Sequence, residues 1–191
     1  MARSSAQNQA LRQSSIEAIL NAAVDLFGRQ GYQATSMAAI AERAGISKGL
    51  AYHYFPAKLS ILASLLETQQ QRFREMLEPL AAVPPEQRLA AWVLQTGELV
   101  ANNRAAMRLL VGLLFSETPE VAQLLAQQKA QAQAQMDREF QLIGPLFQQP
   151  GDFLRLRWAL LGLTYEFLAD ADEQALQQGL TQLLNPGLKE P

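Results

Sequence analysis

This chain of 191 residues has no cysteine and only one histidine. Without thiols it can form no disulfide, bind no metal through thiolates and carry no thiol redox sensor. No apolar run approaches the roughly 18 to 20 residues of a membrane-spanning helix. The N-terminus is polar and has no signal-like apolar stretch. These absences predict a protein of the reducing cytoplasm with no membrane partner.

Groups that carry catalysis are also scarce. No nucleophile with a base, no pair of carboxylates and no phosphate-binding loop after a strand can be recognised. Asp170, Asp172 and Glu173 could form a divalent-cation site, but Asp170 and Glu173 also fit the start of a helix as a cap, which we favour. The sequence therefore predicts no enzymatic activity, no cofactor and no metal site.

Charge is sparse and unevenly placed along the chain. Charged residues make up 18% of the sequence, and the net charge is −2 at pH 7. Residues 1–60, however, carry six basic and three acidic groups, whereas the remaining chain carries ten basic and fifteen acidic ones. A cationic end on an otherwise acidic protein favours binding of nucleic acid at that end. Chance partitioning is the alternative, so this asymmetry serves only as support.

The sequence does contain two short helical patterns between Thr35 and Lys58, separated by a glycine. The hydroxyl of Thr35 or Ser36 can cap the first helix, and Ser47 can cap the second. Gly45 permits the left-handed backbone that a sharp turn needs. The segment therefore predicts a helix-turn-helix.

The second of these helices has two unlike halves. At 100° per residue, one half is apolar and should face the core, with Leu50, Ala51, Tyr54 and Phe55. The other half consists of Lys48, Gly49, Tyr52 and His53. A helix in the major groove needs a small residue at close approach, a cation near phosphate and flat groups near base edges. A hairpin that only packs would carry Leu, Glu or Gln there, and His53 alone could be an ordinary surface histidine.

The run from Thr35 to Lys58, preceded by Phe27, Gly31 and Tyr32, closely resembles the DNA-binding domain of the TetR (tetracycline repressor) family of bacterial regulators. The shared pattern is Phe-x-x-x-Gly-Tyr, Thr-Ser, Ile-Ala-x-x-Ala-Gly-Ile-Ser-Lys-Gly, Tyr-x-Tyr-Phe and Lys. The match covers about the first quarter to third of the chain. It is far more specific than a generic helix-turn-helix.

The resemblance implies contacts with DNA for eight residues of this segment, and Ser47 completes the DNA-binding residues that we expect. Phosphates would be held by Thr35 or Ser36 and by Lys58, the DNA backbone would meet Tyr52 and Tyr54, bases would face Lys48, Gly49 and His53, and Ser47 would cap the reading helix.

Two positions at the start of the next helix bear on this assignment. Lys58 is a cation near a helix N-terminus, which is unfavourable for the helix dipole and suggests an outside anion such as phosphate. Ala57 departs from the family, which often has a capping Ser or Asn there. An alanine cap costs roughly 1 kcal/mol of helix stability, so we expect a looser entry to this helix.

No segment shows the period-two pattern of a strand, and the sequence predicts an all-α fold of about nine helices. We expect a three-helix DNA-binding domain over residues 1–57, with a mobile arm to about residue 12. An α-helical effector-binding and dimerisation domain should follow over residues 58–191. The expected helices of that part span residues 58–78, 86–101, 104–115, 119–143, 152–169 and 173–184.

The helix expected over residues 152–169 is apolar on two sides and should therefore be buried on two sides. One line contains Leu154, Trp158, Leu161, Tyr165 and Leu168, and the other Phe153, Leu156, Leu160, Leu163 and Phe167. By resemblance, the last two helices would pair with a second copy in a four-helix interface. The interface residues that we expect are Leu156, Leu160, Leu163, Phe167, Leu176, Leu180 and Leu183.

The larger domain should also hold a small-molecule pocket, for which the sequence offers bulky apolar groups with a few polar tips. The candidates are Trp92, Gln95, Thr96, Met107, Leu110, Phe115, Trp158 and Tyr165. Each of them could equally be an ordinary core residue. Because this part has no histidine, an apolar or aromatic compound is favoured over a chelated metal complex or a polyanion.

These features predict a ligand-responsive transcriptional regulator, preferably a repressor. It would bind a palindromic double-stranded operator as a homodimer and be released by a small apolar or aromatic effector. A DNA-architectural or scaffolding protein without an effector is the alternative, and an enzyme on a helical core is a distant third. No pattern identifies the effector, the operator or the regulated genes, or distinguishes repression from activation.

Overall fold

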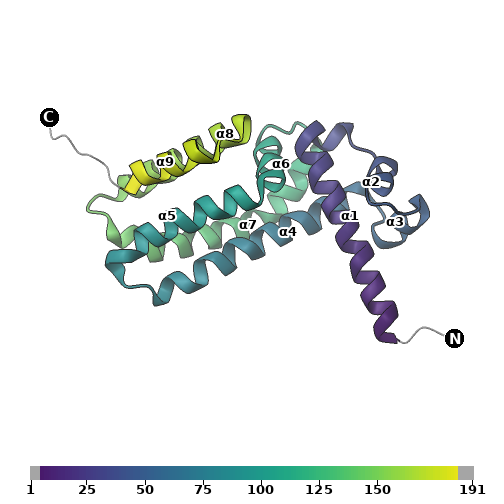
Figure 1. The fold of residues 1–191 in the computed structure, drawn as a ribbon, viewed down its shortest axis with the longest axis horizontal. Helices are drawn as coiled ribbons and strands as arrows, with labels where there is room; N and C mark the ends of the chain where they lie inside the picture. Colours follow the sequence, from purple (N-terminus) through teal and green to yellow (C-terminus); the bar gives the residue numbers. More distant parts are fainter. Residues whose placement is uncertain (1–4, 185–191) are drawn as a thin grey trace. The chain divides into compact units, whose positions relative to one another are not determined.

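The computed structural model describes residues 5–184, and within this range the chain forms nine α-helices and no strand (Figure 1). The all-α prediction is confirmed. The α-helices are α1 (Ser5–Ala34), α2 (Met37–Arg43), α3 (Lys48–Tyr54), α4 (Lys58–Leu77), α5 (Pro85–Asn102), α6 (Arg104–Leu114), α7 (Pro119–Ile143), α8 (Pro150–Asp170) and α9 (Glu173–Leu184). Two short 3-10 helices, η1 (Glu78–Ala82) and η2 (Gly144–Leu146), follow α4 and α7.

By packing, the chain divides into two compact units. Unit 1 comprises Met1–Gln69 and Arg108–Ala126, and unit 2 comprises Gln70–Met107 and Gln127–Pro191. The helices α4, α6 and α7 each contribute residues to both units. The functional boundary expected between residues 57 and 58 is a different kind of division and remains a prediction.

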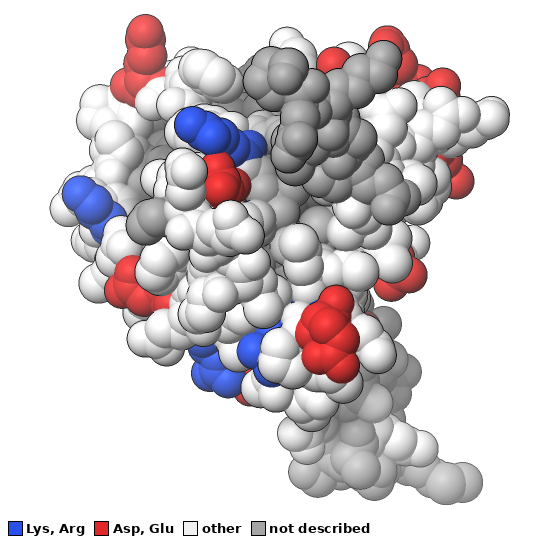
Figure 2. All heavy atoms as spheres, turned by 90° about the vertical axis from the view of Figure 1, so that its left-hand side faces the viewer, with Lys and Arg blue, Asp and Glu red and all other residues white. Residues whose placement is uncertain are grey.

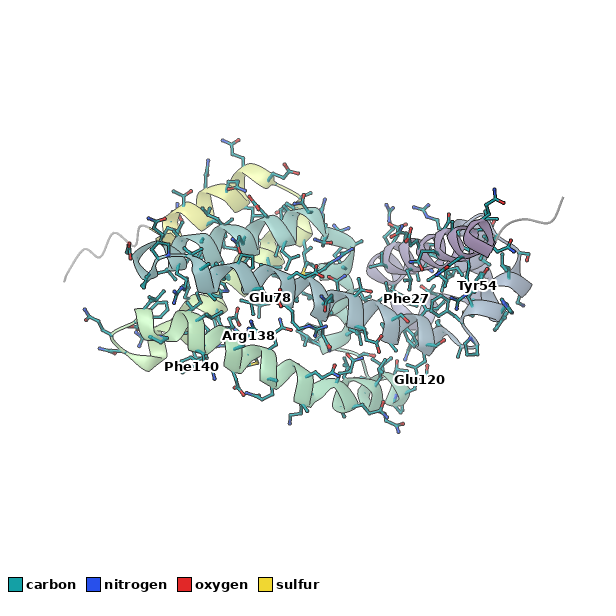
Figure 3. All side chains as sticks on the ribbon, turned by 90° about the horizontal axis from the view of Figure 1, so that it is seen from below. Phe27, Tyr54, Glu78, Glu120, Arg138 and Phe140 are labelled. Carbon is teal, nitrogen blue, oxygen red and sulfur yellow. The ribbon has the colours of Figure 1, made fainter. Side chains whose placement is uncertain are left out.

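Unit 1 has a single apolar core to which six helices contribute. Phe27 belongs to this core and the half-buried Tyr54 packs against it; both are labelled in Figure 3. Asp25 of α1 binds Arg29 of its own helix and Arg43 of α2, each at 2.6 Å, and so joins the first two helices at the surface. The most deeply buried members of this core are Ile19, Ala23, Ile40, Ala51, Ile61, Leu62 and Val121.

Helix α1 is longer than expected at its N-terminal end. It begins at Ser5, so residues 5–12, where we expected an arm before the first helix, are helical. This stretch contains Ala, Gln, Leu and Arg and no Gly or Pro, a composition that allows the helix to extend toward the N-terminus. Residues 1–4 of the expected arm lie outside the described residues.

In unit 2, α5, α8 and α9 pack against one another. Leu180 of α9 lies so close to Gly97 of α5 that a side chain at residue 97 would collide with it, and Leu163 of α8 lies equally close to Gly179 of α9. The small residues therefore let these helices approach each other. The buried core of the unit includes Leu77, Leu80, Trp92, Val93, Ile143, Phe153, Leu160, Phe167, Leu176 and Leu180.

The acidic residues between α8 and α9 cap a helix, as the sequence favoured, although the capping residue is a different one. The carboxylate of Asp172 accepts a hydrogen bond from the main-chain N–H of Ala175 at 2.9 Å. Ala171, just before it, has the left-handed φ of 59°.

Surface charge is mixed on the face that Figure 2 shows, where Lys and Arg side chains lie among Asp, Glu and uncharged residues. Within residues 5–184, no single helix is long and apolar enough to cross a membrane, and only α6 taken together with Pro119–Leu146, as a bent pair, passes that test of length and composition.

Candidate nucleic-acid interface and associated surfaces

The predicted helix-turn-helix is present as α2, a tight turn and α3. Ser36 caps α2, since its hydroxyl accepts a hydrogen bond from the N–H of Ala39 at 3.1 Å. Gly45 adopts a φ of 68° in the turn, a conformation that favours glycine. Ser47 then caps α3 by accepting from the N–H of Leu50 at 3.2 Å. The capping serines thus set both helix starts, as the sequence indicated.

Helix α3 turns its polar half outward. Ala51 and Phe55 are buried, Leu50 and Tyr54 are half-buried, and the four residues of the opposite half, Lys48, Gly49, Tyr52 and His53, are exposed. The Lys48 ammonium lies 5.9 Å from the centroid of the Tyr52 ring, whose side chain is 44% exposed. Cation, ring and imidazole therefore share one accessible surface, which we call the α3 surface.

Gly49 lies in the middle of the α3 surface. A Cβ built there would meet no other atom within 4 Å, so the fold itself does not require glycine at this position. Glycine inside a helix costs about 1 kcal/mol relative to alanine. Gly49 therefore lowers the stability of α3, and no contact within the folded chain requires a glycine there.

Of the two hydroxyls expected to hold a phosphate, only Ser36 is exposed. Thr35 is 2% exposed, and its hydroxyl donates to the carbonyl of Gly31 at 2.8 Å while accepting from the Gln30 amide at 3.1 Å. These bonds close the end of α1 around the kink at Gly31, where φ is 85°. The structure thus corrects the assignment of Thr35 to DNA contact: its hydroxyl is buried and already bonded.

Lys58 also has partners inside the chain. Its Nζ donates to the carbonyl oxygens of Tyr32 at 2.6 Å, Thr35 at 2.8 Å and Gln33 at 3.3 Å, and lies 4.2 Å from the centroid of the Tyr32 ring. An ammonium has three protons to donate, so these carbonyls account for all of them. The physical argument that this cation needs an outside anion is therefore wrong, because the C-terminal carbonyls of α1 supply the negative end of a dipole.

Ala57 does not leave the start of α4 without a cap partner. The Ser60 hydroxyl accepts from the N–H of Ala57 at 3.4 Å and donates to its carbonyl at 2.6 Å. A side chain three residues into the helix therefore reaches back to the residue before it, as the second half of a capping box does. The expected looseness of this helix entry has a local compensation that the sequence analysis missed.

Comparison with known proteins agrees with this geometry. The family described as "Bacterial regulatory proteins, tetR family" matches residues 19–65, which include α2 and α3 entirely. The transcriptional regulator UidR of Escherichia coli strain K12 is 29% identical over 182 residues, which cover 87% of this chain and 89% of UidR. The transcriptional repressor KstR of Mycobacterium tuberculosis is 33% identical over 131 residues, covering 68% of this chain and 54% of KstR.

The chain belongs to the TetR family. A solved structure described as a SmeT–triclosan complex has the same fold, with a TM-score of 0.65 and 21% identity over 90% of each chain. The relatives are transcriptional regulators and not enzymes, so the prediction of a non-enzymatic regulator is confirmed at this level. Regulators of the TetR family, often repressors, bind operators and small-molecule effectors as dimers.

The residues that we expected at a TetR-type dimer interface are buried or half-buried within the single chain. Four of them are buried, namely Leu160, Phe167, Leu176 and Leu180, and Leu156, Leu163 and Leu183 are half-buried. Leu163 and Leu180 pack on Gly179 and Gly97. This expectation is corrected for the buried residues, since their side chains already fill the core of unit 2.

Four of the five residues in the other line of α8 face outward, whereas the fifth, Leu168, is buried at 6% exposure. Leu154 is 51% exposed, Trp158 69%, Leu161 41% and Tyr165 64%. Their spacing of four, three and four residues places them on one side of the helix, and we call them the α8 strip. Sequence analysis had recognised this line but had not assigned it to the outside, because both lines of α8 are apolar.

The expected effector residues do not form one group. Phe115, Trp158 and Tyr165 are 80%, 69% and 64% exposed, which corrects their assignment to a pocket lining. Leu110 packs against the core of unit 1. Trp92 and Met107 are buried in unit 2, and Gln95 and Thr96 are half-buried there.

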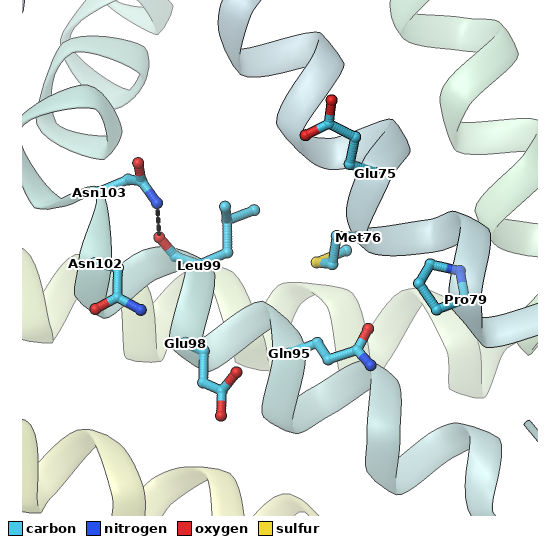
Figure 4. A pocket seen from close by; sticks show the side chains of 8 residues that line it. All are labelled: Glu75, Met76, Pro79, Gln95, Glu98, Leu99, Asn102 and Asn103. Atoms are coloured by element: carbon cyan, nitrogen blue, oxygen red, sulfur yellow. Dashed lines mark hydrogen bonds between the residues drawn. The ribbon is translucent and has the colours of Figure 1, made fainter.

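A groove in unit 2 shares only Gln95 with the predicted pocket (Figure 4). Its volume is about 320 Å³, and its lining is more polar than expected: Glu75, Met76, Pro79, Gln95, Glu98, Leu99, Asn102 and Asn103. The Gln95 Oε1 is buried with no hydrogen-bond partner among the described residues. The spacing of Gln95, Glu98 and Asn102 on one side of α5 was a signal in the sequence that we did not use.

A half-buried carboxylate beside Trp92 was also missed. Glu139 of α7 accepts a hydrogen bond from Trp92 Nε1 at 3.0 Å and pairs with Arg157 of α8 at 3.3 Å. Burial raises the pKa of Glu139, although the Arg157 charge and the Trp92 hydrogen bond oppose that shift. Trp92 therefore has a polar partner inside the fold, which explains how its indole N–H is satisfied while the ring is 1% exposed.

Proposed function

We propose that this TetR-family protein is a repressor that binds a palindromic operator as a homodimer and releases it when a small molecule occupies unit 2. The observation that carries the proposal is the α3 surface. Lys48, Tyr52 and His53 are exposed together on a capped helix whose opposite half is buried or half-buried.

Direct contact of α3 with bases is supported by Gly49. Since the fold has room for a side chain at this position, the absence of one has no internal reason. A DNA backbone or base edge approaching the helix supplies a reason, because a small residue permits close approach in the major groove. Lys48 then lies near phosphate, and Tyr52, Tyr54 and Ser36 flank the base-reading His53.

Dimerisation is proposed to occur through the α8 strip. A helix-turn-helix reads one half-site, and two-fold symmetry supplies the second. The strip places Trp158 and Tyr165, two rings of the kind enriched at interface hot spots, on a helix beside exposed leucines. Pairing with a second copy would bury this apolar surface, which in a monomer is left in water.

The effector is proposed to act through α4. This helix carries residues 58–69 of unit 1 and residues 70–77 of unit 2, and Glu75 and Met76 of its second part line the groove. A small aromatic compound with hydrogen-bond donors suits a lining of Met76, Leu99 and Pro79 with carboxylates and amides. The SmeT–triclosan complex, whose fold this chain shares, contains a bound compound.

Selection of bound fragments from random DNA tests the proposal. We expect a recovered palindrome, a mass of two chains on one operator, and a compound that weakens the complex. By reciprocity, a compound that lowers operator affinity tenfold must bind about tenfold more weakly to the DNA-bound dimer, a coupling of roughly 1.4 kcal/mol. DNA binding without sequence preference and without any responsive compound would instead support a DNA-architectural protein.

A further inference from the structure

The tyrosine at the end of α1 is held from two sides within unit 1. On one side, the Lys58 ammonium of α4 binds the main-chain carbonyls of Tyr32, Gln33 and Thr35 and lies over the Tyr32 ring. On the other side, the Tyr32 hydroxyl donates to Glu120 at 2.8 Å. Glu120 is in the first turn of α7 (Figure 3). We call Lys58, Tyr32 and Glu120 the Tyr32 clamp.

The main chain that the clamp holds leads directly into the helix-turn-helix. Thr35 is the residue before the Ser36 cap of α2, so the carbonyls bound by Lys58 lie within four residues of that cap. Helix α1 has no basic residue in its own last turn. Lys58 therefore supplies, from another helix, the positive group that C-terminal carbonyls favour.

Further contacts hold the end of α1 in place. The Gln33 amide donates to the Thr118 hydroxyl at 2.7 Å, next to the start of α7. Burial lowers the pKa of Lys58, whereas the charge of Glu120 raises it, so Glu120 favours the charged ammonium as well as binding the tyrosine. Tyr32 itself is 6% exposed, and its ring packs 5.3 Å from that of Phe27.

We propose that Lys58 is a positioning residue for DNA binding, which acts through the carbonyls of residues 32–35, and that Glu120 reinforces it through Tyr32. The clamp keeps the entry to α2 in the conformation that presents Ser36 and the α3 surface to DNA. This inference rests on the proposed DNA-binding function. It differs from the phosphate contact expected for Lys58, in which the ammonium would leave its carbonyls and bind DNA directly.

Operator affinity measured over a range of salt concentrations separates the two roles of Lys58. Lys58→Met keeps the unbranched stem and removes the ammonium, and Lys48→Met is the matched control on the α3 surface. A phosphate contact contributes about 0.9 to the slope of log affinity against log salt. We expect Lys58→Met to weaken binding by about 30-fold with the wild-type slope, and Lys48→Met to flatten the slope by about one unit. A slope flattened by Lys58→Met to the same extent would overturn the positioning role.

Variants on the far side of the clamp test the part of Glu120. Tyr32→Phe and Glu120→Ala are each expected to weaken operator binding about three- to tenfold without changing the salt slope, since each removes one hydrogen bond. The variant with both changes should bind the operator as tightly as the weaker-binding of the two single variants, because both changes break the same hydrogen bond. Glu120→Gln, which keeps an acceptor oxygen, should restore most of the affinity.

Glu117→Ala is the control, because it removes an exposed carboxylate from the segment just before α7. All affinities are measured on protein whose active fraction has been titrated with excess operator, so that partial unfolding is not counted as weak binding. If Tyr32→Phe and Glu120→Ala bind the operator as well as Glu117→Ala does, the proposed role of Glu120 is wrong. The proposed DNA-binding function is not affected by that result.

Hydrogen exchange of the α2 amides provides a readout that does not depend on DNA. We expect faster exchange in Lys58→Met and Glu120→Ala than in Glu117→Ala. If the wild-type protein binds no selected DNA, the proposed function is wrong, and hydrogen exchange then tests the Tyr32 clamp by itself. Unchanged protection of the α2 amides in both variants would overturn the clamp.

Discussion

Helices α3 and α8 both expose aromatic rings, but the neighbours of those rings differ. On α3, the half-exposed ring of Tyr52 lies beside the Lys48 ammonium and His53. On α8, Trp158 and Tyr165 lie in line with Leu154 and Leu161. An exposed ring by itself therefore does not identify a partner.

The neighbours indicate the chemistry of the partner. A cation, a histidine and a residue without a side chain suit DNA, whose phosphates attract positive charge and whose base edges are read by polar groups at close range. Leucines around aromatic rings suit another apolar surface, because burying them removes hydrocarbon from water. We infer that α3 binds nucleic acid and that α8 binds a second copy, and the following predictions test this contrast.

The largest expected effect is a loss of stability, and it concerns the line of α8 that contains the buried Phe167. Phe167 is 4% exposed, and the Arg104 guanidinium lies 5.4 Å from its ring centroid. Phe167→Ala should lower the free energy of unfolding by about 3–5 kcal/mol, through lost burial and a cavity. Urea unfolding should give the same loss at low and high protein concentration. Tyr165→Ala on the outer side is the control, and its smaller loss should depend on concentration. Equal losses of unfolding free energy for both variants would contradict the conclusion that one side of α8 lies in the core and the other faces a partner.

The next effect concerns the α8 strip. Trp158→Glu places a charge in the proposed interface and should shift sedimentation from dimer to monomer. It should also weaken operator binding by roughly 2–4 kcal/mol, as expected for an interface hot spot. Far-UV circular dichroism should stay unchanged, since residue 158 is exposed in the single chain. Gln178→Glu on the exposed polar side of α9 is the control. A Trp158→Glu protein that remains dimeric would place the interface elsewhere.

On α3, His53→Ala should change sequence preference more than overall affinity. We expect a loss of about 1–3 kcal/mol confined to one base position in each half-site, because one side chain reads one base edge. Competition among operator variants measures the effect, with Lys129→Ala, an exposed cation on α7, as the reference. A uniform loss over all sequences would assign His53 to the DNA backbone.

The smallest effect on stability is expected at Gly49. Because a Cβ there meets nothing within 4 Å, Gly49→Ala should raise the free energy of unfolding by up to about 1 kcal/mol. The same change should weaken operator binding, since the methyl group would stand between α3 and the groove. Thermal unfolding and operator titration of one preparation compare the two effects. If the variant is more stable and binds as well as wild type, close approach at residue 49 is not needed.

Sequence reasoning worked where a helix had unlike halves. In α3 and its C-cap, Ala51 and Phe55 could face only the core, and Lys48 and His53 could face only water, so periodicity alone gave the orientation. It failed for α8, where Phe167 and Trp158 are equally apolar, and the line expected at the interface is the one that packs inside the chain. It failed for Lys58 as well, because its carbonyl partners lie 23 to 26 residues earlier in the chain.

The sequence by itself determined the all-α class, the helix-turn-helix and its outward residues, and the family. These depend on local periodicity, capping serines and a glycine turn, which act over a few residues. Only the tertiary structure decided which line of α8 is buried, that Thr35 and Lys58 bind within the chain, and that the groove of unit 2 is lined by Glu75 and Glu98. Those outcomes depend on which helices pack together, and such contacts join residues far apart in sequence.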